Sequence, residues 1–219
     1  MVIWRGQPSF YWRTESPIHR DACVSRKGLK STDEYEVDLY ERFLKHSSHL
    51  LDCKRLSPLE LLSIGRHHGL PTRLLDWTTN PLIALYFAVE DASLMDEDAA
   101  LLARIVPRAS FISYEESQST GVDYLRWISG FDSWKAYIPP NINSRISAQH
   151  SIFTIEPDPE DVQELLIEEG VRPETHKFLI KKDFKLNLLT TLQNFGVNPS
   201  TVMPDLHGIC RYLSELRFD

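Results

Sequence analysis

The sequence predicts an α+β fold in which helices pack around a small mixed sheet. Short apolar runs of strand length are bounded by turn residues, and amphipathic stretches with helix-capping residues lie between them. The chain of 219 residues contains no internal repeat and no low-complexity linker, and its length suits one domain with a sizeable core. We therefore predict a single domain over residues 1–219.

Four strands are predicted from apolar runs. The first covers residues 2–4, and a longer buried run over residues 99–106 stops at Pro107. Alternating β-branched and aromatic residues predict two further strands, over residues 149–155 and 177–180.

The helices of the first half are predicted from their capping residues. Thr32 caps a helix with an apolar stripe, and Ser57 caps a second one that runs to His67 or His68, where Gly69 breaks it. A third helix begins after Thr79 or Asn80. Pro81 suits its first turn, and the residues that follow are apolar almost all round, so this helix is expected to be buried.

The second half of the chain is less regular. Residues 110–144 are expected to form a helix or a long loop that covers one side of a cleft, and the acidic segment 158–170 includes a short helix. A helix through Leu186, Leu189 and Leu192 stops at Gly196, and a final helix closes the chain over residues 201–217.

Composition excludes some classes of function. A net charge of −7 argues against a general nucleic-acid binder, although Lys177, Lys181, Lys182 and Lys185 form either a local basic patch or a solvated strand edge. Three cysteines in no metal-binding or redox spacing are expected to be reduced thiols of a cytoplasmic protein. No apolar run reaches the length of a membrane span, so no membrane partner is expected.

The polar segment before the third helix is the first candidate site. Asp76, Trp77 and Thr78 supply a carboxylate, an aromatic surface and a hydroxyl next to the free N–H groups of a rigid helix start. Two alternatives remain open. The segment could instead be a structural turn held by an Arg73–Asp76 ion pair, and Trp77 could instead be a core residue.

Two further groups of polar residues suit an anionic ligand. Arg5 offers five fixed donors for phosphate or carboxylate, and Gly6 lets a ligand approach the backbone; alternatively, Arg5 forms a structural ion pair with Asp76. Arg145 and Gln149 stand four residues apart at the start of a strand and suit a polar ligand or a structural role.

The adjacent His67 and His68 point about 100° apart on a helix, so no metal site is expected.

The chain resembles the FRG domain family in four motifs that occur in order. These are Trp4-Arg5-Gly6-Gln7, then His67-His68-Gly69-Leu70-Pro71-Thr72-Arg73-Leu74-Leu75-Asp76-Trp77-Thr78, then Arg145-Ile146-Ser147-Ala148-Gln149-His150-Ser151-Ile152-Phe153-Thr154, and finally a C-terminal signature in Leu192-Gln193-Asn194-Phe195-Gly196-Val197 and Met203-Pro204-Asp205-Leu206-His207-Gly208-Ile209. The chain departs from the usual family pattern at Arg66, where glutamine is usual, and at Ser151, where glycine is usual.

At the level of the fold, the order of these motifs is similar to that of ADP-ribosyltransferases of the Arg–Ser–Glu type. The resemblance implies that Arg5 holds the phosphates or ribose of NAD, that Thr78 supports the strand around the nicotinamide ribose, and that Gln149 replaces the catalytic glutamate. Because an amide lacks the negative charge, either Asp76 takes the electrostatic role or the site binds a nucleotide without transferring ADP-ribose.

The resemblance therefore implies two functions of different classes. The first is an NAD-dependent ADP-ribosyltransferase-like enzyme or NAD glycohydrolase, acting on a protein or nucleic-acid acceptor as a bacterial or phage toxin or defence effector. The second is a nucleotide-sensing or protein-binding module without turnover. The candidate catalytic residues are Asp76, Gln149 and Arg5, and the candidate NAD-binding residues are Arg5, Gly6, Arg73, Trp77, Thr78 and Arg145. We expect Arg5, Arg73, Asp76, Thr78, Arg145 and Gln149 to line one cleft.

Overall fold

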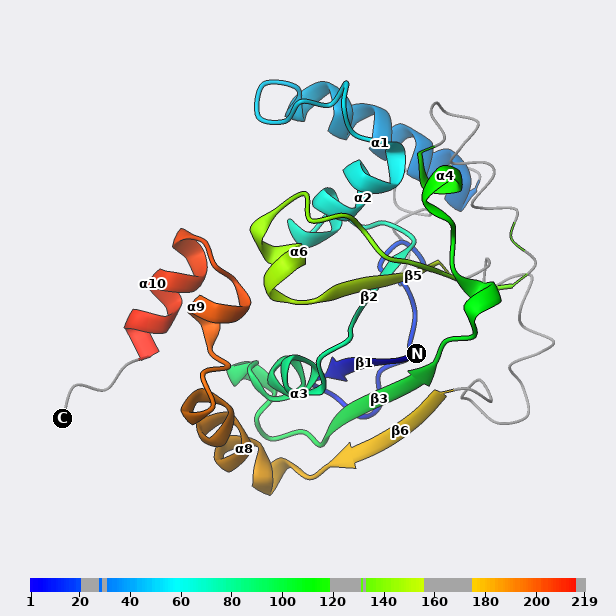
Figure 1. The fold of residues 1–219 in the computed structure, drawn as a ribbon. Helices are drawn as coiled ribbons and strands as arrows, with labels where there is room; N and C mark the ends of the chain where they lie inside the picture. Colours follow the sequence, from blue (N-terminus) through cyan, green and yellow to red (C-terminus); the bar gives the residue numbers. More distant parts are fainter. Residues whose placement is uncertain (21–27, 29–30, 119–130, 132, 156–174, 216–219) are drawn as a thin grey trace.

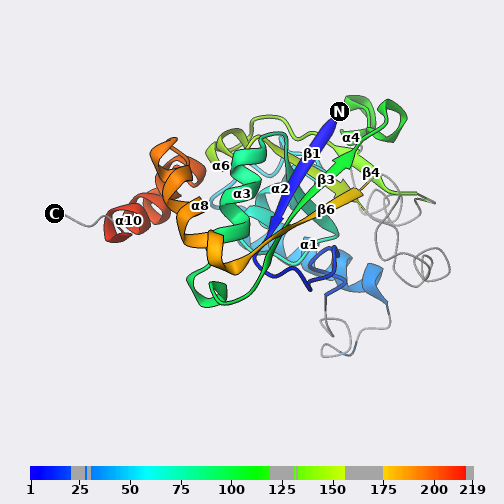
Figure 2. The ribbon, with the colours of Figure 1, turned by 90° about the horizontal axis from the view of Figure 1, so that it is seen from below.

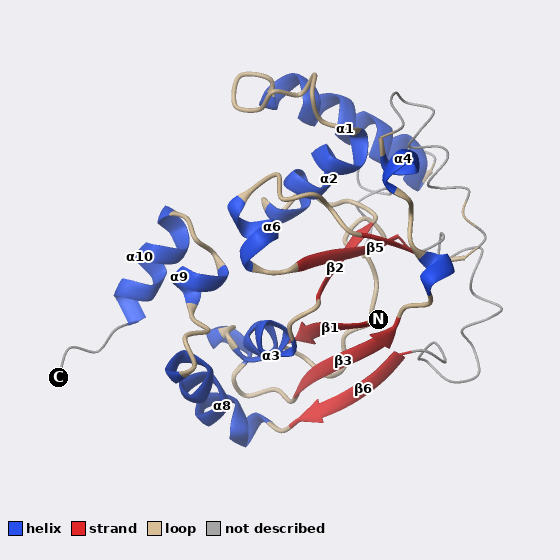
Figure 3. Ribbon diagram, in the orientation of Figure 1, coloured by secondary structure: helices blue, strands red, loops and turns tan. Residues whose placement is uncertain are grey.

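The computed structural model describes residues 1–20, 28, 31–118, 131, 133–155 and 175–215. Its centre is a six-stranded sheet in the order β4–β5–β2–β1–β3–β6 (Figure 1, and red in Figure 3). The strands are β1 (Val2–Gln7), β2 (Leu74–Thr78), β3 (Ala99–Ile105), β4 (Lys135–Tyr137), β5 (Ser151–Ile155) and β6 (Thr175–Ile180).

The predicted α+β class is confirmed, and the strand pairing is more uniform than expected. All neighbouring strands in this sheet pair antiparallel, and the parallel contact in the described residues is an isolated bridge between Phe111 and Ala136. β1 and β2 share a single registered pair, Trp4 with Thr78, whereas β1 pairs with β3 along its whole length. The sheet therefore opens between β1 and β2.

The helices begin where local signals predict them, with small shifts. Ser31 caps α1 (Thr32–Ser47) in place of Thr32, and Ser57 forms a capping box with Glu60 at the start of α2 (Pro58–His67). Asn80 caps α3 (Pro81–Val89), and its side chain accepts from the N–H of Leu82. The other helices in the described part of the chain are η2 (Ala92–Leu94), η3 (Arg108–Ser110), α4 (Tyr114–Ser117), α6 (Ser144–Ala148), α8 (Lys182–Asn194), α9 (Pro199–Val202) and α10 (Leu206–Glu215).

Three predictions for the second half need correction. The segment from 110 to 144 contains a strand, β4, besides α4, and the single final helix is two helices, α9 and α10, separated by Pro204. The predicted strand over 149–155 begins only at Ser151, because the residues before it belong to α6 and its end. Residues 119–130 and the acidic segment 158–170 lie outside the described part. α8, α9 and α10 lie together at one end of the sheet (Figures 1 and 2).

Helices α2 and α3 cover the same face of the sheet. A Cβ atom on Gly6 would lie 1.9 Å from the carbonyl oxygen of Ala84, so α3 rests directly on β1. On β1, Trp4 points to the same face as Gly6. Its partner on β2 is Thr78, which points to the same face as Leu74. Leu74 packs in the cluster beneath α2, so both helices lie on this face. The gap between the two helices is where a pocket can form.

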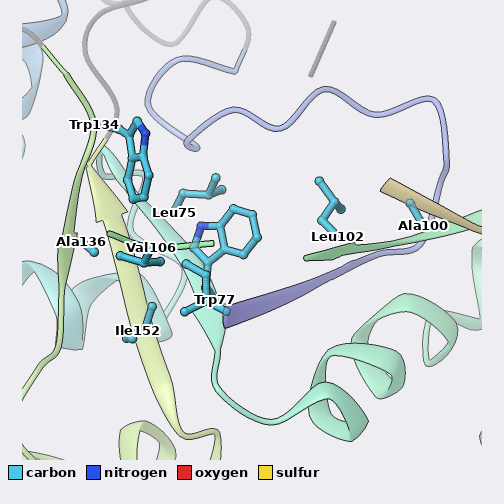
Figure 4. Close-up of a cluster of buried hydrophobic side chains, with 9 residues drawn as sticks. Leu75, Trp77, Ala100, Leu102, Val106, Trp134, Ala136 and Ile152 are labelled. Carbon is cyan, nitrogen blue, oxygen red and sulfur yellow. The ribbon is translucent and has the colours of Figure 1, made fainter. Parts of the chain in front are cut away.

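The opposite face of the sheet carries a second core. Alternate residues of β1, β2, β3 and β5 point there and meet side chains from β4 and the segment before it (Figure 4). The cluster contains Ile3, Leu75, Trp77, Ala100, Leu102, Val106, Trp134, Ala136 and Ile152.

The expected lysine cluster does not form a free basic patch. Lys185 is fully buried, and its ammonium group donates to the carbonyls of Pro8, Leu94 and Glu97. Lys181 pairs with Asp98 instead. Among the described residues, no helix is both long enough and apolar enough to cross a membrane.

Candidate binding pocket

A pocket of about 380 Å³ lies between α2, α6 and α3, at the place where β1 and β2 separate. Its volume falls in the range of sites for small ligands. It brings together residues from every predicted site motif. The lining residues are Trp4, Arg5, Gly6, Pro8, Trp12, Arg66, His67, Asp76, Trp77, Thr78, Ala84, Phe87, Glu90, Asp91, Arg145, Gln149, Ser151 and Met203.

The expectation of a shared cleft is met for all but one residue. Arg5, Asp76, Thr78, Arg145 and Gln149 line the pocket together although they are widely separated in the sequence. Their roles in binding or chemistry remain predictions.

Arg73 is the exception, and its assignment to the site is corrected. Its side chain is buried and forms ion pairs with Glu36 and Asp33 of α1. Its backbone N–H also donates to Glu36 at 3.1 Å. Arg73 is therefore neither a pocket residue nor the partner of Asp76, since α1 supplies two carboxylates on the side away from the pocket.

Asp76 pairs instead with two arginines of the pocket wall. Arg66 Nε donates to Asp76 Oδ2 at 2.8 Å, while Arg5 Nη1 lies 3.8 Å from the same oxygen and donates to the Asp76 backbone carbonyl at 2.6 Å. The carboxylate is held at the opening between β1 and β2. From the sequence, Arg66 is noted only as a departure from the family pattern, directly before the motif that starts at His67.

The positive charge around Arg5 exceeds the negative charge. Burial lowers the pKa of Arg5 to about 10; Asp76 opposes this effect, and Arg20, Arg66 and Arg104 add to it. Arg5 Nε is buried without a hydrogen-bond partner in the described part of the chain. A buried, incompletely paired guanidinium among other cations is an environment that favours a bound anion.

Gly6 is required by the fold. The atoms closest to its hydrogen are backbone atoms of α3, so the group that approaches this glycine is the helix, not a ligand as expected. Gly6 still borders the pocket because α3 forms one of its walls.

Trp77 is a core residue, which corrects its assignment as a stacking platform. It is only 3% exposed, and its indole N–H donates to the hydroxyl of Thr154 at 2.9 Å. The guanidinium of Arg104 lies 4.7 Å from the ring centroid, between the indoles of Trp77 and Trp134. The indole therefore faces away from the helix-covered side of the sheet (Figure 4).

The wall opposite Arg5 is one short helix and its end. Asn143 caps α6, so Arg145 and Gln149 share a helical face rather than a strand as predicted. The hydroxyl of Thr78 donates to the Gln149 carbonyl at 2.7 Å and accepts from the N–H of Asn80 at 3.0 Å, which ties this wall to the start of α3.

The C-terminal segment anchors the same wall. The side-chain amide of Gln149 donates to the carbonyl of Val202 at 3.1 Å, and Arg145 Nε donates to Asp205 at 2.6 Å. Arg145 Nη1 also donates to the backbone carbonyl of His67 at 3.0 Å, so α6 and the end of α2 are joined.

His67 and Ser151 also line the pocket, although neither was a candidate site residue from the sequence. Burial lowers the pKa of His67 to about 4, with Arg66, Arg145 and His68 contributing and Asp76 opposing. His67 Nε2 lies 3.4 Å from the hydroxyl of Ser151, and Phe153 meets the ring edge to face. The sequence motif places His67 near the site, but its burial and its contact with Ser151 depend on residues that are distant in the sequence. Among the described residues, no cluster of three or more acidic, histidine or cysteine side chains is suited to a metal ion.

The fold and the pocket define an α+β protein with an arginine-lined, ligand-sized site. Residues 1–97 match the family model of the FRG domain. This match confirms the resemblance over the first 97 residues, which include Arg5, Arg66, His67 and Asp76. Searches of curated proteins and of solved structures gave no match.

Proposed function

We propose that the pocket binds NAD and cleaves the bond between nicotinamide and ribose, as an ADP-ribosyltransferase-like enzyme or an NAD glycohydrolase. The observation that carries the proposal is the meeting of Arg5, Thr78 and Gln149 in one pocket. These are the three positions at which the sequence resembles the NAD site of ADP-ribosyltransferases.

The electrostatics of the pocket support an anionic ligand. A pyrophosphate carries two negative charges and can accept several hydrogen bonds from a guanidinium. Arg5, Arg66 and Arg145 line the same space, while the acidic Glu90 and Asp91 line another part of the pocket. An anion at this position would offset the repulsion among Arg5, Arg20 and Arg66, and it would raise the pKa of Arg5 toward its ordinary value.

The cleavage step needs negative charge near C1′ of the ribose, where an oxocarbenium-like centre develops. Gln149 cannot supply that charge. Asp76 lines the same pocket, is about one-third exposed at 32%, and is fixed by Arg66. We assign the electrostatic role to Asp76 and a positioning role to Gln149. With such chemistry, the protein would act on a protein or nucleic-acid acceptor as a toxin or defence effector.

A second candidate function is a nucleotide-sensing or protein-binding module without turnover. One observation favours it: the amide N–H of Gln149 is already used to hold the carbonyl of Val202. A side-chain amide that already donates to the backbone is less available to bind a reacting ligand.

One experiment distinguishes the NAD-cleaving enzyme from the module without turnover. The protein is incubated with NAD while released nicotinamide is quantified, and thermal melts are recorded with NAD, ADP-ribose and ATP. A ligand that binds only the folded state raises the Tm, by an amount equivalent to about 2.7 kcal/mol at a hundredfold excess over Kd. Nicotinamide release supports the enzyme, and a raised Tm without release supports the sensing module. No release and no shift with any of the three nucleotides would show that the enzyme and the nucleotide-sensing module are both wrong, and would leave a protein-binding surface or a structural ion-pair network.

Arg5→Lys is the matched variant for the binding step. Lysine keeps the positive charge but lacks the planar guanidinium group with its paired N–H donors. The variant should therefore reduce the NAD-induced Tm shift while the ligand-free Tm stays near that of the wild type. Arg42→Lys is the control, because Arg42 lies on the exposed side of α1 and pairs with Asp38.

A further inference from the structure

His67 and Ser151 form a hydrogen-bonding pair on the wall of the pocket. They come from different elements, the last turn of α2 and the first residue of β5, and both line the cavity. His67 Nε2 and Ser151 Oγ are 3.4 Å apart, a loose contact of the kind that tightens when a ligand fills a site.

The surroundings hold the imidazole in place. The backbone carbonyl of His67 accepts from Arg145, and the ring packs against Phe153 with 5.6 Å between the ring centroids. Of the charged groups near the ring, Asp76 on β2 favours the protonated form, whereas Arg66 and His68 on α2 and Arg145 on α6 oppose it. The net effect with burial is a neutral ring at physiological pH, and in the tautomer with its proton on Nδ1 the unprotonated Nε2 faces the Ser151 hydroxyl.

We propose that His67 and Ser151 form the proton relay that activates the nucleophile attacking C1′ of NAD. The inference rests on the proposed function and names the acid–base residues of its reaction. A water molecule in the pocket donates to Ser151 Oγ, and the hydroxyl proton of Ser151 points to His67 Nε2.

The step balances as follows. The water oxygen forms a bond to C1′, the bond between C1′ and the nicotinamide nitrogen breaks, and its electron pair leaves with nicotinamide. The proton of the water passes to Ser151 Oγ while the proton of Ser151 passes to His67 Nε2. The products are ADP-ribose, nicotinamide and one proton, which the imidazolium then releases to solvent.

The neighbouring histidine provides a matched control. His68 is exposed at the end of the same helix and does not line the pocket. His67→Gln keeps a hydrogen-bonding group but cannot take up the proton, and His68→Gln makes the same chemical change one residue away. Ser151→Ala removes the other member of the relay without adding bulk.

The test measures nicotinamide release and the NAD-induced Tm shift for the wild type and these variants. General base catalysis contributes about 10²–10⁴-fold, so His67→Gln and Ser151→Ala should each lower the release rate by about 100-fold or more. The NAD-induced Tm shift should persist in both, and His68→Gln should match the wild type. Free imidazole should restore part of the rate of His67→Ala, because it can occupy the vacated space, but it should not restore Ser151→Ala.

The outcomes separate the two proposals. A wild type that releases no nicotinamide overturns the proposed enzyme and the relay with it. An active wild type with a His67→Gln variant as fast as His68→Gln overturns the relay alone. Loss of the NAD-induced shift together with the rate, without rescue by imidazole, would also overturn it, because His67 would then serve in binding.

Discussion

Glu36 of α1 and Arg73 form an ion pair from which water is almost excluded, with the two side chains 1% and 2% exposed. The backbone N–H of Arg73 adds a second bond to the same carboxylate. The pair joins α1 to the residue immediately before β2, the strand that carries Asp76. The position of the pocket wall therefore depends on a contact outside the pocket.

Glu36→Gln should destabilise the fold strongly. The variant leaves the buried Arg73 charge facing a neutral amide, and breaking a buried pair in this way costs about 3–5 kcal/mol. Urea unfolding at neutral pH measures the loss. Asp38→Asn is the control on the same helix: its exposed pair with Arg42 is worth about 0–1 kcal/mol, and an equal loss in both variants would contradict the structural role of Glu36.

Asp76→Ala should lower both stability and activity. Its carboxylate is partly exposed, so removing it should cost less than breaking the Glu36 pair, about 1–3 kcal/mol for the unmatched arginine donors. Nicotinamide release should fall far more than this loss of stability explains, because Asp76 is the proposed electrostatic group. Denaturant unfolding and the NAD assay are compared in the same buffer. A destabilised variant that keeps full activity would remove Asp76 from the site.

Gly6→Ala should disturb the pocket through α3. The added methyl group would overlap the backbone of Ala84 and Ala88, which no side-chain rotation can relieve. We expect a loss of at least about 3 kcal/mol in the free energy of unfolding. Gly69→Ala is the comparison: its φ of +90° is strained for alanine, but nothing lies within 4 Å, so about 1–2 kcal/mol is expected. The reverse order of the two losses would show that α3 does not rest on β1 as described.

His67 should contribute a pH-dependent part of the stability. Its folded-state pKa of about 4 lies below the ordinary value of 6.5, so the unfolded chain binds the proton first as the pH falls. The contribution is fully present above about pH 6.5 and is lost toward pH 4, amounting to about 3 kcal/mol at most. Urea unfolding from pH 7 to pH 4 should show a shallower decline for His67→Gln than for the wild type. Parallel curves would mean that His67 titrates normally.

The start and end of each helix could be predicted where a few adjacent residues decide them. Asn80 and Pro81 mark the start of α3, and Gly69 and Gly196, both at positive φ, mark the ends of α2 and α8. Such signals need no knowledge of the rest of the chain. In contrast, the sequence predicts a strand where α6 begins. A helix of five residues has no periodicity to detect, and its formation depends on the Asn143 cap and on distant partners such as Asp205.

The residue types of the site were predictable, but their pairing was not. The sequence indicates arginine, aspartate, threonine and glutamine side chains at one site, and five of these residues do line one pocket. Arg73, however, was matched to Asp76, the nearest carboxylate in sequence, whereas its partner Glu36 is 37 residues away. Partners of this kind are set by how α1 packs on the sheet. The same is true of Trp77, whose place in the core follows from the alternation of β2 once β5 is paired beside it.

The pocket is built from two parts of the chain, which are joined by hydrogen bonds from Thr78 to the Gln149 carbonyl and from Arg145 to the His67 carbonyl. Arg5, Arg66 and Asp76 belong to the 97 residues that match the FRG domain, but Arg145, Gln149 and Ser151 do not, nor do Val202 and Asp205, which anchor them. A chimera that joined residues 1–97 to the later part of another protein with an FRG domain would keep the wall formed by Arg5, Arg66 and Asp76 and replace the wall opposite. If the pocket binds a pyrophosphate as proposed, such a chimera should change the selectivity among ligands that share this group while Arg5 still binds the group itself.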